Sequence, residues 1–157
     1  MPGPVDYEKI TIAPDPDVAV WWDATKEKKF LLPECQDCGH KWWPPWPACS
    51  ACASMNVGWH EIEGTGFVYS YISVEQPILG HMVTAVPYVV AIVELPDGTN
   101  ADGSKTRISA LMLDDEADVA IGLPVKLEWD DHPTQEYKMP RWRVTDKSAP
   151  GAWHFSW

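Results

Sequence analysis

Residues 35–52, CQDCGHKWWPPWPACSAC, hold all four cysteines of the chain in two matched Cys-x2-Cys pairs. Two thiolates at this spacing can bind one side of a tetrahedral metal ion, and a second pair completes four ligands. Gly39 follows the first pair, where a positive φ would turn backbone N–H groups toward the sulfurs. The alternatives are a disulfide framework, a redox Cys-x-x-Cys motif and four unrelated core cysteines. The matched spacing favours a structural metal site, with zinc expected and iron as the alternative, whose ligands are Cys35, Cys38, Cys49 and Cys52.

The charge of the chain limits its partners. The formal net charge is −11, from 23 acidic and 12 basic side chains in 157 residues. Because nucleic-acid binding depends on clustered Lys and Arg, we expect no nucleic-acid partner. No apolar run reaches about 18 residues, the length of a membrane-spanning helix, and residues 1–10 show no secretory signal. Four thiols committed to a metal suit a reducing compartment, so the expected location is the cytoplasm.

Residue patterning predicts a mainly β protein. Asp15-Pro16 indicates the start of a short helix of about ten residues, with Asp15 as its cap. From residue 57, alternating and β-branched segments separated by turn residues predict five or six strands of a small antiparallel barrel. The predicted parts are an N-terminal arm and helix (1–30), a metal ribbon (31–56), a barrel (57–146) and a C-terminal tail (147–157).

Tryptophan and proline are abundant, at 10 and 15 residues, and three tryptophans lie in the metal loop. The loop sequence is Lys41-Trp42-Trp43-Pro44-Pro45-Trp46-Pro47. Its rings either shield the thiolates or form an exposed platform, and we expect a contact surface because so short a loop cannot bury three indoles itself. The stretch 98–106 has the composition of a phosphate-binding loop. Its spacing does not match and no long helix follows, so we interpret it as a hairpin loop.

No catalytic group stands out in the sequence. A metal bound by four protein thiolates has no open position for substrate, so the site should be structural. The metal also uses all four cysteines, and no G-x-S-x-G motif is present. The histidines are dispersed and form no second metal motif; they stand at positions 40, 60, 81, 132 and 154.

Further segments extend the pattern set by the cysteine pairs. They are Leu31-Leu32, Gly64-Thr65-Gly66, the stretch from Pro87 to Leu95, and the stretch from Ile121 to Val125. Over about residues 16–145 the layout resembles the acyl-CoA-associated zinc-ribbon/OB-fold family, also called domain of unknown function 35. The resemblance implies a rubredoxin-like zinc ribbon followed by a five- to six-stranded OB-fold barrel. It also implies a thiolase-fold catalytic partner, because family members accompany thiolases, hydroxymethylglutaryl-CoA synthases, acyltransferases and aldolases.

For function, the resemblance implies a non-catalytic zinc subunit of a heteromeric thiolase, in a hetero-tetramer with its partner. The substrate would be a β-ketoacyl-CoA, for example an aromatic one such as benzoylsuccinyl-CoA, with coenzyme A shared by the complex. The candidate coenzyme A contacts are Lys41, Trp42, Trp43 and Trp46, and the aromatic residues 153–157 would bury against the partner. Alternatives are an accessory subunit of an aldolase or acyltransferase and a free-standing acyl-CoA carrier. A single-stranded nucleic-acid-binding OB protein is a further alternative, which the acidic charge opposes.

Overall fold

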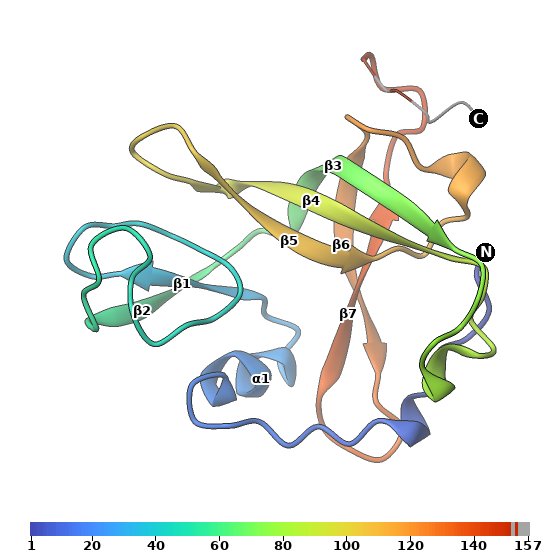
Figure 1. Ribbon diagram of the computed structural model, residues 1–157, viewed down its shortest axis with the longest axis horizontal. Helices are drawn as coiled ribbons and strands as arrows, with labels where there is room; N and C mark the ends of the chain where they lie inside the picture. Colours follow the sequence, from blue (N-terminus) through green and yellow to red (C-terminus); the bar gives the residue numbers. More distant parts are fainter. Residues whose placement is uncertain (152, 154–157) are drawn as a thin grey trace.

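Two antiparallel sheets organise the protein (Figure 1). The computed structural model describes residues 1–151 and 153. The small sheet consists of β1 (Leu31–Cys35) and β2 (Val57–Glu61). The large sheet has the strand order β5-β4-β3-β6-β7, built from β3 (Thr65–Val74), β4 (Tyr88–Thr99), β5 (Lys105–Leu111), β6 (Pro124–Asp131) and β7 (Lys138–Val144). The described residues also form one α-helix, α1 (Ala19–Thr25), and the 3-10 helices η1 (Tyr7–Lys9), η2 (Gly80–Met82) and η3 (Glu116–Asp118).

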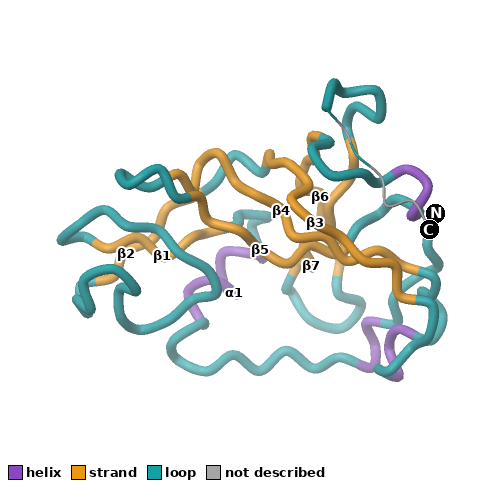
Figure 2. The backbone as a smooth tube through the Cα atoms, turned by 45° about the horizontal axis from the view of Figure 1, so that its top comes forward, coloured by secondary structure: helices purple, strands orange, loops and turns teal. Residues whose placement is uncertain are grey.

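The large sheet curls until its two edge strands meet (Figure 2). Met112, just after β5, forms a parallel bridge with Trp142 of β7, and the Leu113 N–H donates to the Trp142 carbonyl at 2.7 Å. Gly66 of β3 permits the close approach of Val93 of β4, because a Cβ at Gly66 would lie 2.5 Å from a methyl carbon of Val93. The predicted mainly β architecture, with a short helix and a curled OB-type sheet, is confirmed.

One hydrophobic core fills the curl and continues under the helix. Alternate residues of β4 point inward and are buried, as the two-residue period of a strand requires. The core includes Trp142 of β7, and it extends to Trp21 of α1, Phe30 and Leu32 of β1. The small sheet and α1 are therefore packed onto the barrel and are not separate lobes.

Helix α1 is shorter than predicted, and the predicted cap is wrong. The helix begins at Ala19, and Val18, at the N-cap position, makes no side-chain capping bond. The Asp15 carbonyl accepts the Val18 N–H at 3.2 Å, so residues 16–18 form a turn ahead of the helix. One face of the helix docks on the core, because Trp21 and Thr25 are buried. Seven residues are too few for a stable isolated helix, so this packing holds it in place.

Strand β2 belongs to the ribbon side of the molecule. Its five residues pair in register with β1, from Leu31 opposite Glu61 to Cys35 opposite Val57. The boundary predicted at residue 57 remains a prediction, although the strand that follows it pairs with β1. Within the predicted tail, Trp153 pairs with Ile121, whereas residues 152 and 154–157 lie outside the described residues. None of the described helices is long and apolar enough to cross a membrane.

Candidate metal centre

The first cysteine pair sits on a tight backbone turn at the end of β1. The Cys35 N–H donates to the His40 carbonyl at 2.9 Å, and the Gly39 N–H donates to the Cys35 carbonyl at 2.8 Å. Gly39 has a φ of +74°, as predicted from its place after Cys38. These bonds fold the chain back so that both sulfurs of the pair face the same side.

The second pair repeats the same turn. The Cys49 N–H donates to the Ser54 carbonyl at 2.8 Å, and the Ala53 N–H donates to the Cys49 carbonyl at 2.9 Å. Ala53 takes the place of the glycine and has a φ of +61°. The Ala51 N–H also points at the Cys49 sulfur, at 3.3 Å. Two turns with equivalent hydrogen bonds therefore present four thiols.

The four sulfurs fit a tetrahedral metal ion. All four ligand atoms lie within 4.8 Å of one another, and the Cys35–Cys52 and Cys38–Cys49 sulfur pairs are each 3.7 Å apart. A zinc–sulfur bond of about 2.3 Å places the sulfurs of a tetrahedron about 3.8 Å apart, close to these distances. The predicted ligands are thus brought together. They could bind a metal such as zinc, and the choice between zinc and iron stays a prediction.

The electrostatics of the cluster also favour a cation. A hydrogen bond from the backbone N–H of Cys38 is the main cause that lowers the pKa of Cys35 to about 7. For Cys38 a hydrogen bond from the His40 backbone acts in the same direction, but burial and the neighbouring sulfurs outweigh it and raise the pKa to about 12. Once one thiol has ionised, its neighbours resist ionisation because like charges repel. A divalent cation among the sulfurs removes that resistance.

The two turns allow a matched stability test. Gly39→Ala is expected to lower the free energy of unfolding by about 1 kcal/mol, because an L-residue is strained at positive φ. A Cβ at Gly39 would meet no atom within 4 Å, so the cost is conformational and not steric. Ala53→Gly is expected to raise the free energy of unfolding by about 0.5 kcal/mol, since glycine relieves the strain at positive φ but loses more chain entropy on folding. Urea unfolding of the metal-loaded protein measures both changes in the free energy of unfolding. A lower free energy in both variants would contradict the explanation from strain at positive φ.

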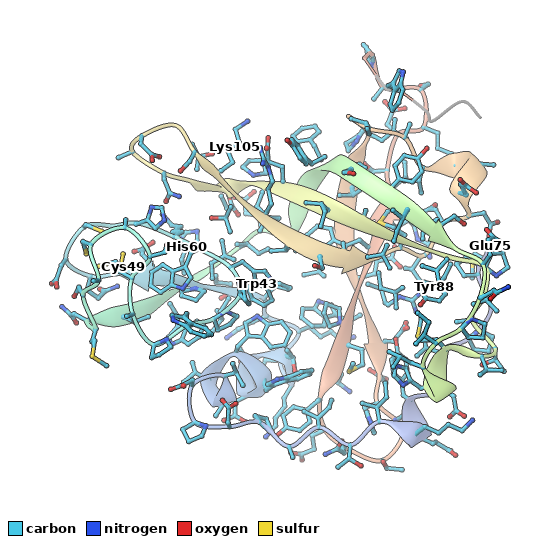
Figure 3. The ribbon with its side chains drawn as sticks, viewed as in Figure 1. Trp43, Cys49, His60, Glu75, Tyr88 and Lys105 are labelled. Carbon is cyan, nitrogen blue, oxygen red and sulfur yellow. The ribbon has the colours of Figure 1, made fainter. Side chains whose placement is uncertain are left out.

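The three tryptophans of the metal loop do not form a common platform. Trp42 is 7% exposed and packs between Cys35 and Cys49, so it shields the thiols. Trp43 lies between the ribbon and the large sheet, where its ring packs 5.5 Å from Trp21 (Figure 3). Trp46 is 67% exposed. The loop could not bury three rings itself, but the ribbon cluster buries Trp42, and contacts with Trp21 and Phe30 half-bury Trp43.

A contact between the metal loop and the β4–β5 hairpin was not foreseen. The Asn100 side chain accepts the Lys41 N–H at 2.8 Å and donates to the Lys41 carbonyl at 3.1 Å. Thr106 also donates to that carbonyl, at 3.2 Å. The stretch 98–106 is the hairpin that the sequence predicted, but β4 runs on to Thr99 and the turn itself is 100–104. Only the position of Asn100 in a turn hinted at this contact, which we call the latch.

A polar cavity of about 210 Å³ lies beside the latch. His40 and Lys41 line it from the metal loop, and Lys105 and Arg107 line it from β5. Lys41 pairs with Glu34 at 3.1 Å, and Lys105 and Arg107 share Glu94 at 3.2 and 3.0 Å. Cations from the ribbon and from the barrel are thus gathered in an otherwise acidic chain.

Removing the latch should loosen the ribbon from the barrel. Asn100→Ala is expected to lower the free energy of unfolding by about 1–3 kcal/mol, because the Lys41 N–H loses its acceptor and the Lys41 carbonyl keeps only the Thr106 hydroxyl. Asn100→Asp keeps the acceptor for the N–H and should cost less. Hydrogen exchange at the Lys41 amide reads the local effect directly; unchanged protection in Asn100→Ala would exclude the latch as a restraint.

A family model matches part of this chain, and two curated proteins match most of it. The family model described as "ChsH2, C-terminal OB-fold domain" matches residues 59–130. The "Probable enoyl-CoA hydratase alpha subunit" of Thermomonospora curvata is 37% identical over 113 residues, which are 72% of this chain and 33% of that protein. The "3-oxo-4,17-pregnadiene-20-carboxyl-CoA hydratase alpha subunit" of Mycobacterium tuberculosis is 32% identical over 117 residues, 74% of this chain and 35% of that protein. The chain spans about a third of the length of these curated relatives.

Two solved structures have the same fold. A chain of the "Ltp2-ChsH2(DUF35) aldolase" matches with a TM-score of 0.71 and 31% identity, covering 87% of this chain and 100% of that chain. A DUF35-family protein of unknown function from Sulfolobus solfataricus matches with a TM-score of 0.54 and 16% identity, over 82% of this chain and 85% of that chain, which shows likeness of fold alone. The family expected from the sequence is confirmed: the chain belongs to the DUF35 family, with a ChsH2-type OB-fold domain.

Proposed function

We propose that this chain is a non-catalytic accessory subunit or domain of an aldolase complex that cleaves an acyl-CoA. The observation that carries the proposal is the 31% identity to the whole of a DUF35 chain from a structure named as an Ltp2–ChsH2 aldolase. The four-thiol cluster also supports it, because a metal held by four protein ligands has no open position for substrate. The catalytic groups would then belong to a partner subunit with a thiolase fold.

The relatives favour an aldolase over the thiolase that the sequence analysis placed first. Their names are those of an aldolase and two hydratase subunits. These reactions are chemically consecutive, because hydration of an enoyl-CoA yields the β-hydroxyacyl-CoA that a retro-aldol cleavage consumes. Thiolysis of a β-ketoacyl-CoA would use the same kind of partner and the same small subunit, so it is the activity to test beside the aldolase.

The residues of this chain would act by keeping the metal loop in one conformation against the barrel. Cys35, Cys38, Cys49 and Cys52 would hold zinc, which when bound supplies four rigid bonds and no Lewis-acid site. The latch at Asn100 then fixes the metal loop against the barrel. A loop fixed by the metal and by the latch can form one wall of an acyl-CoA channel. Because the loop is already ordered, substrate binding carries no further entropy cost for ordering it.

Coenzyme A contacts from the metal loop remain part of the proposal. Of the four predicted residues, Lys41, Trp42 and Trp43 line the polar cavity, and Trp46 is exposed. Trp42 is buried and Trp43 is half-buried. Lys41 would face a phosphate of coenzyme A, and Trp46 would contact its adenine or pantetheine. Trp42 and Trp43 would act by keeping the loop rigid.

Co-purification from the native host tests the proposal. The chain carries an affinity tag at its native expression level, and mass spectrometry identifies what is bound in stoichiometric amount. We expect a thiolase-fold protein in a hetero-tetramer with this chain. Recovery of the chain without such a protein, or binding to a single-stranded oligonucleotide at physiological ionic strength, would contradict the assignment.

A further inference from the structure

The outward side of the large sheet is apolar where a solvated sheet should be polar. Inward residues of β4, such as Val89 and Val93, are buried, but the outward Val90 and Ile92 are apolar as well. An antiparallel sheet with one face in water normally alternates apolar and polar residues, whereas strands covered on both faces are apolar throughout. Strand β4 therefore has the composition of a strand covered on both faces.

Strand β3 continues this apolar side. Phe67, Tyr69 and Ile72 are 47%, 49% and 62% exposed. The register shift between Val68 and Ser70 lets Tyr69 and Ile72 both point outward, while Tyr71 stays buried. The bulge therefore turns the Tyr69 ring outward and leaves the Tyr71 ring in the core.

Strand pairing makes these residues one continuous surface. Ile72 lies opposite Val90, Ser70 opposite Ile92, and Val74 opposite Tyr88, so the side chains of each pair share a face. We call this surface the outer face; it consists of Phe67, Tyr69, Ile72, Tyr88, Val90 and Ile92. Phe67, Tyr69 and Ile72 are exposed, whereas Tyr88, Val90 and Ile92 are half-buried. Contiguous apolar patches at the surface mark interaction sites.

One end of the outer face has a rim of cations. The Arg107 guanidinium lies 3.6 Å from the centroid of the Tyr69 ring, and Lys105 lies beside it on β5. Lys126 of β6 is exposed and lies opposite Thr65. Glu94 is the carboxylate that Arg107 and Lys105 share. Figure 3 shows Lys105 and Tyr88 at opposite ends of the sheet, so the rim is confined to the hairpin end.

We propose that the outer face is where the catalytic partner docks, with partner carboxylates opposite Arg107, Lys105 and Lys126. This inference rests on the proposed function and assigns the surface that it requires. An apolar centre with charged residues at its rim is the usual composition of a specific interface. A second copy of this chain fits less well, because each copy carries a net charge of −11 and the two would repel.

Substitutions on and off the outer face test the assignment. The probe is the thiolase-fold protein identified by co-purification, produced recombinantly and titrated with this chain by calorimetry. Ile72→Asp and Tyr69→Asp are expected to weaken binding at least tenfold, because each buries a carboxylate in the apolar centre. Val20→Asp, on the exposed side of α1, is the matched control and should change affinity less than twofold. All three positions are exposed, so thermal unfolding should change little, the loss of the Arg107 contact in Tyr69→Asp being the largest difference.

The remaining outcomes separate this inference from the proposed function. In the wild-type complex, hydrogen exchange should slow in residues 67–74 and 88–92, a result that needs no variant. Unchanged affinity in Ile72→Asp, with protection elsewhere, would overturn the docking surface and leave the proposed function standing. A wild-type chain that is dimeric alone, and monomeric as Ile72→Asp, would assign the face to self-association instead. A wild-type chain that binds no thiolase-fold protein would overturn both.

Discussion

Cys35→Ser is expected to abolish metal binding and to unfold the ribbon while the barrel stays folded. Apart from the metal, the ribbon has only a small buried cluster of its own, which consists of Cys35, Trp42 and Cys49. Its remaining restraints are the packing of β1 on the barrel core and the latch. Structural zinc contributes about 10–16 kcal/mol of apparent binding free energy in small zinc modules, far more than such a cluster can replace. Elemental analysis should give one metal ion per wild-type chain and none in the variant. Hydrogen exchange should lose protection in residues 31–61 only.

Ser50→Ala is the control for this substitution. Ser50 is exposed between Cys49 and Cys52 and offers no thiol, so its replacement should keep the metal and the exchange pattern. A chelator applied to the wild-type protein should reproduce the Cys35→Ser pattern. Full ribbon protection in metal-free protein would show that the fold of the ribbon does not depend on the metal.

Trp142→Ala is expected to lower the free energy of unfolding by about 3–5 kcal/mol, the usual cost of truncating a buried aromatic residue. Trp142 is 1% exposed, and its backbone accepts the Leu113 N–H where the edge strands meet. The cavity left by the indole would lie where the two edge strands of the large sheet meet. Urea unfolding followed by far-UV circular dichroism measures the loss.

Arg143→Ala on the same strand gives the comparison. Arg143 pairs with Glu128 at 2.8 Å, and both side chains are partly exposed, so its loss should cost less than about 1 kcal/mol. A similar cost for Trp142→Ala would show that the closure of the sheet contributes little to stability.

The metal centre could be predicted because its information is local. Each Cys-x2-Cys turn is closed by backbone hydrogen bonds that span at most five residues, and the glycine at position 39 indicates the positive φ found there. Ala53 also has a positive φ, but this could not be predicted, since nothing in the sequence marks an alanine for that conformation. The cap at Asp15 failed for a related reason: the Asp-Pro signal started a turn, and the packing of Trp21 set where the helix begins.

Long-range contacts could not be predicted in the same way. The strands of the large sheet were visible as apolar runs, but the bulge at Tyr69 and the pairing of β2 with β1 depend on partners far along the chain. The latch joins Lys41 to Asn100, 59 residues away, through backbone groups that carry no sequence signal at Lys41. The apolar outward side of β4 was in the sequence, but only the register showed that it faces away from the core.

The central claim is that this chain supports a catalytic partner and does not act alone. The most direct measurement compares cleavage of β-hydroxyacyl-CoA thioesters by the metal-loaded chain, by the purified thiolase-fold partner, and by their equimolar mixture. A panel of aliphatic, aromatic and steroid-type thioesters covers the substrate classes, with a β-ketoacyl-CoA plus coenzyme A as the thiolase assay. We predict turnover by the mixture and none by this chain alone. Turnover by this chain alone, or a partner that is equally fast without it, would contradict the account.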